Sequence, residues 1–364
     1  MYEPSAPVQN DTEPEPLLDD STVGAYLMSR GLISDTRVNV RTLAGGVSNV
    51  VLAAEQGARS FVVKQSLARL AVADEWCAPT DRVITEAEAL VLLARITPDN
   101  VPDVYDQDAE RHTITLQLAP HDWTDWKLSL MAGQPQPATA AMLGEILARW
   151  HRETFLSPDL GDRLEDYTAF EMLRIEPYYR TVASRAPEVA GPLNSLIDRL
   201  AAQRLCLVHG DFSPKNILVA PGSARPGDLH PDGLWVIDFE AAHRGDPAFD
   251  IAFMCTHLLL KSLALPGGSD DFDACLRAFC MAYTAHVSDG KAGDTRRLMP
   301  LHPDWTYISQ HIGALLLSRV KGKSPAGYLD PGSEQTAWRM GIRLLNSTQS
   351  TVEDLFRIRN ESRS

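Results

Sequence analysis

The sequence has no apolar run long enough to cross a membrane. A membrane-spanning helix needs about 20 consecutive apolar residues, and every apolar run in the chain is much shorter than that. The N-terminal region also lacks a basic segment followed by an apolar core, which is the pattern of a secretory signal. We therefore expect a cytoplasmic protein that has no membrane partner.

Cysteine and positive charge are both scarce. The five cysteines are odd in number, and none forms a CxxC pair or has the spacing of metal ligands, so we expect reduced thiols rather than a disulfide framework. The 34 Lys and Arg residues are outnumbered by 48 Asp and Glu residues, which gives a formal net charge of -14. This charge disfavours nucleic acid and anionic membranes as partners, and it is compatible with a cationic substrate.

The composition that remains is that of an ordinary globular protein, with 44% hydrophobic and 23% charged residues. A chain of 364 residues is long enough for two lobes rather than one core. Residues 1–20, which begin with a stretch rich in Pro and acidic residues, are expected to be a disordered tail. We expect a nucleotide-binding N-lobe over residues 21–118 and a catalytic, substrate-binding C-lobe over residues 119–364.

The most informative segment is HGDFSPKN at residues 209–216, followed by IDFE at residues 237–240. Asp211 and Asn216 lie five residues apart on one tight loop, and Asp238 follows a short apolar run. Such a set can orient a hydroxyl, hold Mg²⁺ and neutralise phosphate charge, which is most of what phosphoryl transfer requires of a protein. These three residues are the predicted catalytic residues.

Short apolar runs flank this segment. They are partly β-branched and bounded by Gly, Pro or Asp, as is typical of buried strands, and the Gly- and Pro-rich residues 221–228 can only form a turn or loop. The runs are residues 205–208, 217–219 and 234–237. We expect them to form one small β-ribbon that delivers the three polar side chains to the same end.

Each polar residue of this segment has an expected role. Asp211 would accept or orient the proton of the attacking hydroxyl. Asn216 offers a neutral carbonyl oxygen and Asp238 an anionic one, and both suit Mg²⁺. Glu240 is equally compatible with a second metal site and with an ordinary loop carboxylate. His209 is expected to hold the loop through hydrogen bonds of its ring.

The N-terminal half has the order of elements of a kinase N-lobe: two strands around a small-residue turn, and then a strand that carries Lys. The expected strands are residues 38–43, 50–54 and 60–64. Backbone N–H groups of the turn could contact phosphates, because Gly allows close approach. The turn lacks the full GxGxxG spacing, so its position before Lys64 carries this prediction. Its candidate residues are Gly45, Gly46, Ser48 and Asn49.

Lys64 ends an apolar strand, where an ammonium group is poorly placed for solubility alone. We expect it to contact the α- and β-phosphates of the nucleotide and to be oriented by a carboxylate of the next helix. That helix is expected over residues 85–96, where Glu86 shares the inward face with Leu90. Glu88 lies about 200° away at ~100° per residue, so Glu86 is the favoured partner.

The rest of the chain predicts a mainly helical lobe. A strand at residues 113–118 leads into the hinge 119–121, and Gln117 and Leu118 are expected to contact the nucleotide. Asp250 is expected to cap the following helix or to brace the catalytic loop. The expected helices are residues 139–155, 251–265, 272–287, 305–321 and 335–360. The predicted fold class is α+β: a two-lobed, protein-kinase-like fold with an antiparallel sheet in its small mixed N-lobe.

These motifs resemble those of the aminoglycoside phosphotransferase and choline kinase superfamily. The matching segments are HGD at 209–211 with Asn216, DFE at 238–240, and GDPAFD at 245–250. Eukaryotic-type protein kinases carry Arg and Gly where this chain has Gly210 and Glu240. The resemblance covers roughly residues 38–345, and it implies an ATP- and Mg²⁺-dependent kinase with a small-molecule hydroxyl acceptor.

A narrower resemblance is to methylthioribose kinase. It rests on VKQSL at 63–67, on Glu75-Trp76, and on residues 81–90. The last position of the catalytic loop, Asn216, departs from that family's pattern. The adjacent arginine pair of that family's C-terminal region is also missing here, where only Arg339 and Arg343 stand in the corresponding helix. This resemblance implies a sugar-type acceptor without naming the sugar.

Several acceptor classes stay open, and the sequence does not indicate the oligomeric state. A sugar-like metabolite is favoured, held by hydrogen-bonding groups near His257, Trp305, His311 and Arg319. An aminoglycoside is the alternative, and its recognition would need several carboxylates; the candidates are Asp270, Asp271, Asp273 and Glu334. A choline-type amine would need an aromatic cage, with Trp305, Tyr307 and Trp338 as candidates. A non-catalytic nucleotide-binding protein is disfavoured because every catalytic position is filled.

Overall fold

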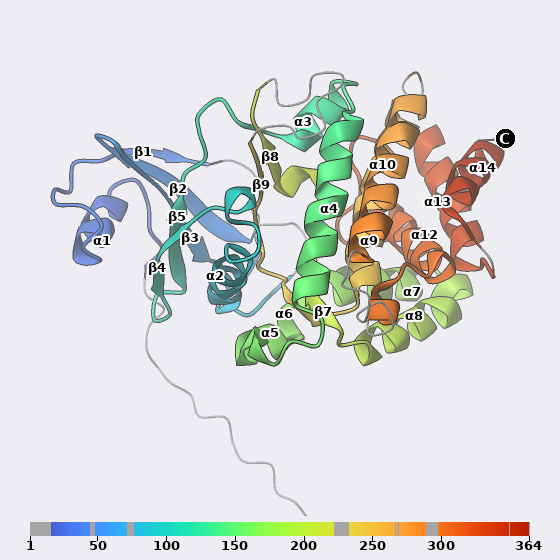
Figure 1. Cartoon of the computed structure of the whole chain (residues 1–364), viewed down its shortest axis with the longest axis horizontal. Coiled ribbons are helices and arrows are strands. Elements are labelled where there is room, and N and C mark those ends of the chain that lie inside the picture. The colour runs from blue at the N-terminus through green and yellow to red at the C-terminus, as the bar shows by residue number, and fades with distance from the viewer. Residues whose placement is uncertain are drawn as a thin grey trace, which may run out of the picture.

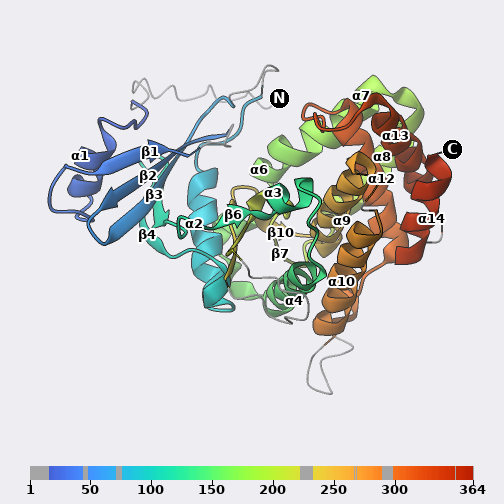
Figure 2. The ribbon, with the colours of Figure 1, turned by 90° about the horizontal axis from the view of Figure 1, so that it is seen from above.

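The computed structural model of the chain describes residues 16–43, 48–70, 76–221, 233–265, 267, 269–288, 298–348 and 350–363. Figure 1 shows a smaller lobe built on a sheet beside a larger lobe built mainly of helices. Seen from above, helix α2 lies between the sheet and the larger lobe (Figure 2). The expected two-lobed α+β fold is confirmed.

The smaller lobe is an antiparallel sheet whose strands, within the described residues, follow the order β1-β2-β3-β5-β4. Lys64 lies on the central strand β3, opposite Val51 of β2 and Ile114 of β5. The strands are β1 (Asn39–Thr42), β2 (Asn49–Gln56), β3 (Arg59–Ser66), β4 (Val104–Asp108) and β5 (Thr113–Gln117). The expected strands are confirmed, whereas β4 is missed because it is a polar edge strand whose register shifts between Val104 and Asp106.

Two described helices complete this lobe. Helix α1 (Val23–Ser29) packs on the outer part of the sheet, and α2 (Arg82–Leu93) follows β3. Helix α2 begins at Arg82 rather than at residue 85, but the expected inward face is confirmed, with Glu86 and Leu90 both buried. Leu18, which precedes α1, is buried, and its N–H donates to Gln65 Oε1 at 2.7 Å.

The strands around the catalytic loop do not form the single ribbon expected from the sequence. They belong to two small sheets: β7 (Cys206–Val208) pairs with β10 (His243–Gly245), and β8 (Ile217–Val219) pairs with β6 (Thr124–Asp125) and β9 (Leu234–Val236). Strand β7, which precedes the loop, pairs with β10, which follows Asp238 in the chain. The sequence does not predict β10, because this segment is short and polar. The loop still leaves one sheet and enters the other at the boundary where the two lobes contact each other, and we call this boundary the cleft.

The larger lobe is mainly helical. Its helices are α3 (Trp126–Met131), α4 (Pro137–Glu153), α5 (Asp162–Glu165), α6 (Thr168–Phe170), the π-helix η3 (Glu171–Arg180), α7 (Thr181–Arg185), α8 (Ala190–Ala202), α9 (Pro247–Ala264), α10 (Ser269–Val287), α12 (Trp305–Lys321), α13 (Pro331–Leu345) and α14 (Val352–Ser362). Short 3-10 turns are η1 (Pro98–Asn100), η2 (Pro158–Leu160), η4 (Pro187–Val189), η5 (Pro214–Asn216) and η7 (Met299–Leu301).

One expectation about this lobe is corrected, and a group of its helices is not predicted by the sequence. The helical run expected over residues 335–360 is two helices, because a capping box between Thr351 and Asp354 starts α14 anew. The helices between residues 162 and 202 are missed, since most are short and their apolar periodicity is interrupted by Pro177 and Pro187. Within the described residues, no helix is both long and apolar enough to cross a membrane.

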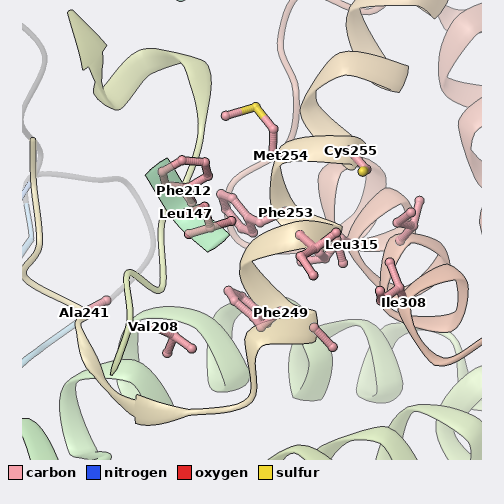
Figure 3. Close-up of a cluster of buried hydrophobic side chains, with 14 of the residues drawn as sticks. Leu147, Val208, Phe212, Ala241, Phe249, Phe253, Met254, Cys255, Ile308 and Leu315 are labelled. Atoms are coloured by element: carbon pink, nitrogen blue, oxygen red, sulfur yellow. The ribbon is translucent and has the colours of Figure 1, made fainter. Parts of the chain in front are cut away.

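A large apolar core packs against the catalytic loop. Phe212, the residue after Asp211, is fully buried and lies beside Leu147 of α4 and near Phe253 of α9 (Figure 3). Trp150 packs edge-on against Phe212 at 6.4 Å between ring centroids. Deleting a buried aromatic ring costs about 3–5 kcal/mol, so this packing fixes the position of the catalytic loop strongly.

Candidate active site

Three charged side chains meet where the two lobes face each other. Lys64 Nζ donates to Glu86 Oε2 and to Asp238 Oδ1, each at 2.5 Å. Lys64 and Glu86 are buried, while 22% of the Asp238 side chain is exposed. The contact between Lys64 and Glu86 confirms the expected pairing, whereas Glu88 contacts Arg163 at 3.1 Å. A cation and a candidate metal ligand from opposite lobes are therefore neighbours.

The charges in this group stabilise one another. Burial alone would lower the pKa of Lys64, but the carboxylates of Asp238 and Glu86 outweigh it and raise that pKa. Burial would likewise raise the pKa of Asp238, yet the positive charges of Lys64 and Lys215 hold it below its ordinary value. Lys64 is therefore an ammonium and Asp238 a carboxylate at neutral pH.

Asp238 also has an unusual backbone. Its φ is +72°, a left-handed conformation that few residues other than glycine adopt. Such a conformation costs about 1–3 kcal/mol and tends to occur at functional sites. Here it directs the carboxylate away from β9 and toward Lys64 of the other lobe.

Glu240 ends a second buried network. Its Oε1 accepts from Ser48 Oγ at 2.8 Å, and its Oε2 accepts from Asn49 Nδ2 at 2.8 Å and from Arg82 Nε at 3.1 Å. Arg82 is 1% exposed and also donates to the carbonyl oxygens of Ser48 and Leu67. Both oxygens of Glu240 thus have donors, and metal binding by Glu240, which would exchange these bonds, stays a prediction.

The other expected nucleotide contacts lie around this network. Ser48 and Asn49 contact Glu240 across the cleft, whereas Gly45 and Gly46 lie outside the described residues. Gln117 ends β5, and its Oε1 accepts from Asp103 N at 3.3 Å. Leu118 follows it as a buried residue of the connection between the lobes. Nucleotide binding by all of them stays a prediction.

Asp250 braces the catalytic loop. Its Oδ2 accepts from His209 N at 2.7 Å and its Oδ1 from Gly210 N at 2.9 Å. The cap of α9 is instead Asp246, which accepts from Ala248 N at 2.9 Å. Of the two roles expected for Asp250, the structure therefore selects the brace.

His209 and Gly210 shape the loop. Asp211 N donates to His209 Nδ1 at 3.1 Å, so the ring proton is on Nε2, which lies 3.1 Å from Ile237 O. Burial lowers the pKa of His209, which keeps the ring neutral in this structural role. Gly210 has a φ of +76°, and a Cβ there would lie 2.6 Å from Ala241 O. A larger residue would not fit at this place.

Asp211 is held by two cations. Its Oδ2 lies 2.9 Å from Arg174 Nη2 and 2.9 Å from Lys215 Nζ. Burial would raise the pKa of Asp211, yet these two charges outweigh it and hold that pKa below its ordinary value. Within the described residues, Oδ1 has no donor at hydrogen-bond distance and is open to a ligand hydroxyl. A carboxylate of low pKa orients a hydroxyl well and is a weak base.

Asn216 and Asp238 offer oxygens suited to a divalent cation. Asn216 Nδ2 donates to Asp211 O at 3.0 Å, which leaves its carbonyl oxygen for a ligand. No group of three or more His, Cys, Asp and Glu side chains able to hold a metal comes together within the described residues. The pair fits Mg²⁺, which usually takes one or two carboxylates and completes its shell with phosphates and water.

A cavity of about 140 Å³ opens beside Asp211, and we call it the acceptor cavity. Four basic side chains line it: Lys127, Lys215, Lys261 and Arg319. Asp211 is its single carboxylate among the described residues. Of the residues expected around the acceptor, His257 and Arg319 line this cavity, whereas Trp305 and His311 do not.

The carboxylates considered for aminoglycoside recognition lie elsewhere. Asp273 is buried, and both its oxygens accept from Arg359 of α14. Asp270 and Asp271 are exposed in the first turn of α10, and Glu334 lies in the first turn of α13. None of these four lines the acceptor cavity.

The comparisons with known proteins agree with this geometry. The family model described as "Phosphotransferase enzyme family" matches residues 39–301. The chain belongs to this family. It is a phosphotransferase that uses an alcohol group as acceptor.

Among curated relatives, this phosphotransferase is similar to methylthioribose kinases. It is 26% identical over 331 residues to that of Yersinia pseudotuberculosis serotype O:3, with 83% of this chain and 74% of the relative covered. It is 29% identical over 321 residues to that of Pectobacterium atrosepticum, with 80% of this chain and 72% of the relative covered.

Solved structures of kinases and phosphotransferases also align with the chain. A choline/ethanolamine kinase family protein from Mesorhizobium loti is 15% identical with a TM-score of 0.49, covering 94% of this chain and 98% of the other. An aminoglycoside 2′-phosphotransferase in complex with GDP is 16% identical with a TM-score of 0.49, covering 95% of this chain and 100% of the other.

Sequence reasoning misses several residues of this site, among them Arg82, Arg174 and Lys261. Arg174 comes from the π-helix η3, an irregularity that often marks functional sites. Pro177 within this helix is a signal of irregular helix geometry, but it does not indicate which side chain faces the loop. Lys261 lies in α9, whose residues are mostly apolar. A Lys in such an apolar helix is the sequence signal that could have identified Lys261 as a candidate site residue.

Proposed function

We propose that this phosphotransferase transfers the γ-phosphate of ATP, with Mg²⁺, to a hydroxyl of a small sugar-like metabolite. The observation that carries the proposal is the placement of Lys64 Nζ at 2.5 Å from Asp238, in the cleft that also contains Asp211. A phosphate-binding cation, a metal ligand and a hydroxyl-orienting carboxylate must all be neighbours if they share one triphosphate.

The metal would be held by Asp238 and Asn216, with Glu240 as a further candidate. Held by these side-chain oxygens, Mg²⁺ would supply positive charge to neutralise the charge that develops on the transferred group. Asp238 supplies an anionic oxygen and is partly exposed to the cleft, so it is the stronger of the first two ligands.

Lys64 would change partners when the nucleotide binds. Its ammonium now donates to two carboxylates, and it would keep Glu86 while turning from Asp238 to the α- and β-phosphates. Arg82 keeps the adjacent backbone in place by binding the Ser48 and Leu67 carbonyl oxygens.

Asp211 would position the acceptor. Its open Oδ1 accepts the hydrogen bond of the attacking hydroxyl, while Arg174 and Lys215 hold Oδ2. The hydroxyl oxygen would bond to the γ-phosphorus as the bond from that phosphorus to the β–γ bridging oxygen of ATP breaks and ADP leaves. The hydroxyl proton would pass late to Asp211 and then to solvent. Lys215 Nζ lies 2.9 Å from Asp211 and 4.0 Å from Asp238. Its ammonium group is therefore near both residues and would stabilise the negative charge of the phosphoryl group during transfer.

The preference for a sugar-like acceptor is supported by the similarity to methylthioribose kinases. An aminoglycoside is the weaker candidate, because its ammonium groups would enter a cavity lined by four basic side chains. The aromatic candidates for a choline cage likewise do not line the cavity.

A coupled assay of ADP release tests the proposal. Wild-type enzyme with ATP and Mg²⁺ is screened against neutral sugars, acidic sugars, aminoglycosides and choline, beside Asp211→Asn as the inactive control. Turnover with a sugar that depends on Asp211 and on Mg²⁺ is expected. Turnover confined to aminoglycosides would reject the sugar, and turnover unchanged in Asp211→Asn would reject the mechanism.

A further inference from the structure

The acceptor cavity has a charge of sign opposite to the whole chain. The chain carries a formal net charge of -14, yet four basic side chains and one carboxylate line this cavity. That carboxylate, Asp211, is already paired with Arg174 and Lys215. Lys127, Lys261 and Arg319 therefore have no carboxylate of their own among the described cavity-lining residues, and they come from three separate helices, α3, α9 and α12.

Lys261 is the exception among the buried cations of the described residues. The five others each form an ion pair with a carboxylate: Lys64 with Glu86, Arg82 with Glu240, Arg174 with Asp211, Arg244 with Glu165, and Arg359 with Asp273. Lys261 is 1% exposed and forms no ion pair in the described part of the chain. Its Nζ donates only to the His257 carbonyl oxygen of its own helix, at 3.3 Å.

Neighbouring donors in the same cavity are also unsatisfied. Arg319 uses Nη1 for the backbone and side-chain oxygens of Ser324, while its buried Nε has no hydrogen-bond partner within the described residues. The buried hydroxyl of Tyr328 has none either, and Lys261 Nζ lies 5.7 Å from the Tyr328 ring centroid. A buried donor without a partner is costly, so these groups favour a ligand that accepts hydrogen bonds.

The surroundings of Lys261 disfavour its charged form. Burial, together with the charges of Lys127 and Arg319, lowers the pKa of Lys261 to about 7, and the Asp125 carboxylate opposes this shift only in part. An anion placed between these cations would remove both the repulsion and the missing hydrogen bonds. A neutral sugar would satisfy the hydrogen bonds but would leave the excess charge in place.

We propose that the acceptor of this phosphotransferase carries an anionic group, a carboxylate or a phosphate, which binds Lys261 and Arg319 in the acceptor cavity while its hydroxyl lies at Asp211. The proposal rests on the proposed function and defines its substrate class as an acidic or phosphorylated sugar. Lys127, which is exposed at the cavity, adds long-range attraction. Tyr178 and Phe253 also line the cavity and would supply apolar contact to the sugar ring.

The test measures binding without ATP, so that it does not depend on turnover. The probes are D-gluconate, D-ribose 5-phosphate and neutral D-ribose, titrated calorimetrically at millimolar concentration into wild-type enzyme, Lys261→Met and Arg319→Met. At least one acidic probe should bind, and should bind at least about tenfold more tightly than D-ribose, with this advantage lost in both variants. The acidic probe that binds identifies the carboxylate or the phosphate as the recognised group.

Two controls locate the binding site. Lys321→Met removes a charge from the end of the same helix as Arg319, where Lys321 lies 4.1 Å from the Trp338 ring centroid, outside the cavity; its affinity for the acidic probe should match wild type. Lys64→Met removes the cation expected to bind nucleotide phosphates, and it should also leave the affinity unchanged. Loss of binding in Lys64→Met with none in Lys261→Met would place the anion at the nucleotide site and overturn the proposal.

Thermal unfolding supplies a readout that does not need the correct probe. Because an unpaired buried ammonium destabilises the fold, Lys261→Met should raise Tm. A lower Tm in this variant would show that the Lys261 ammonium stabilises the folded state, and it would overturn the proposal. Equal affinity for D-ribose and the acidic probes, or no binding of either acid, would overturn it too. Loss of acidic-sugar binding with turnover intact on neutral sugars would reject this inference but not the proposed function.

Discussion

The two sides of the cleft differ in whether their buried cations are paired with carboxylates. On the N-lobe side, Lys64 lies between two carboxylates, and Arg82 is paired with Glu240. In the acceptor cavity, Lys261 is as deeply buried and forms no ion pair within the described residues. Both sides are expected to bind an anionic ligand. Only on the N-lobe side are the buried cations already neutralised by carboxylates before the ligand binds.

This difference follows from what each side must do. Lys64 has to exchange one carboxylate for phosphates that arrive with a metal, so a paired ground state keeps it placed and charged. Lys261 and Arg319 would instead discriminate among acceptors. A cluster of cations without carboxylate partners binds an anionic acceptor more tightly and repels a polyamine. The pairing of a buried cation is therefore informative about ligand class, whereas its burial alone is not.

Removal of the charge of Asp211, which borders both sides, should have the largest effect. Asp211→Asn should lower kcat by about 10³-fold, since it removes the group that orients the hydroxyl. Binding of a nucleotide analogue should be nearly unchanged, and Asp198→Asn, an exposed substitution on α8, should change neither quantity. Steady-state kinetics give the answer, and an Asp211→Asn rate within threefold of wild type would contradict it.

A paired buried cation outside the cleft should affect stability alone. Asp273→Asn would leave the Arg359 guanidinium without the carboxylate that now accepts two of its hydrogen bonds. The expected loss is about 3 kcal/mol in the free energy of unfolding, measured by urea denaturation, with the KM for the nucleotide unchanged. Asp271→Asn, an exposed substitution on the same helix, is the matched control. Equal stability of the two variants would show that the pair is not essential to the fold.

Buried neutral histidines should make the C-lobe sensitive to acid. Burial lowers the pKa of His311 to about 3 and that of His243 to about 4, whereas an unfolded His titrates near about 6.5. The unfolded state therefore binds more protons as the pH falls from about 6.5 toward 4, and stability falls with it. At about pH 5 each histidine should cost about 2 kcal/mol relative to neutral pH.

Urea denaturation at pH 7 and pH 5 measures this loss. His311→Gln should lessen it, and His121→Gln, whose parent side chain is 69% exposed, should leave it unchanged. A pH dependence of His311→Gln identical to that of wild type would contradict the assignment to His311.

The smallest effect is expected from Glu88, the carboxylate beside the Lys64 partner. Glu88→Gln removes only its partly exposed ion pair with Arg163, which is worth at most about 1 kcal/mol. Kinetics should be unchanged, in contrast to Glu86→Gln, which should weaken nucleotide binding. Comparable kinetic losses in the two variants would place both carboxylates in the nucleotide site.

The contrast between the two sides also explains what the sequence could predict. Lys64, Glu86 and the residues of the catalytic loop lie on regular strands, a periodic helix and a contiguous motif, so local patterns reveal them. Arg174 and Lys261 reach the site from a π-helix and from an apolar helix. Their convergence depends on how separate helices pack, which no local pattern records. The split of the expected ribbon into two sheets has the same origin.

The most direct test compares two lysines with two ligands. Calorimetry on Lys64→Met and Lys261→Met would use the Mg²⁺ complex of a non-hydrolysable ATP analogue and, separately, the acidic sugar that binds the wild type. Lys64→Met should weaken binding of the nucleotide analogue alone, and Lys261→Met should weaken binding of the acidic sugar alone. If both substitutions weakened the same ligand, or if Lys261→Met weakened neither, the assignment of the paired cation to the nucleotide and of the unpaired cation to the acceptor would be contradicted.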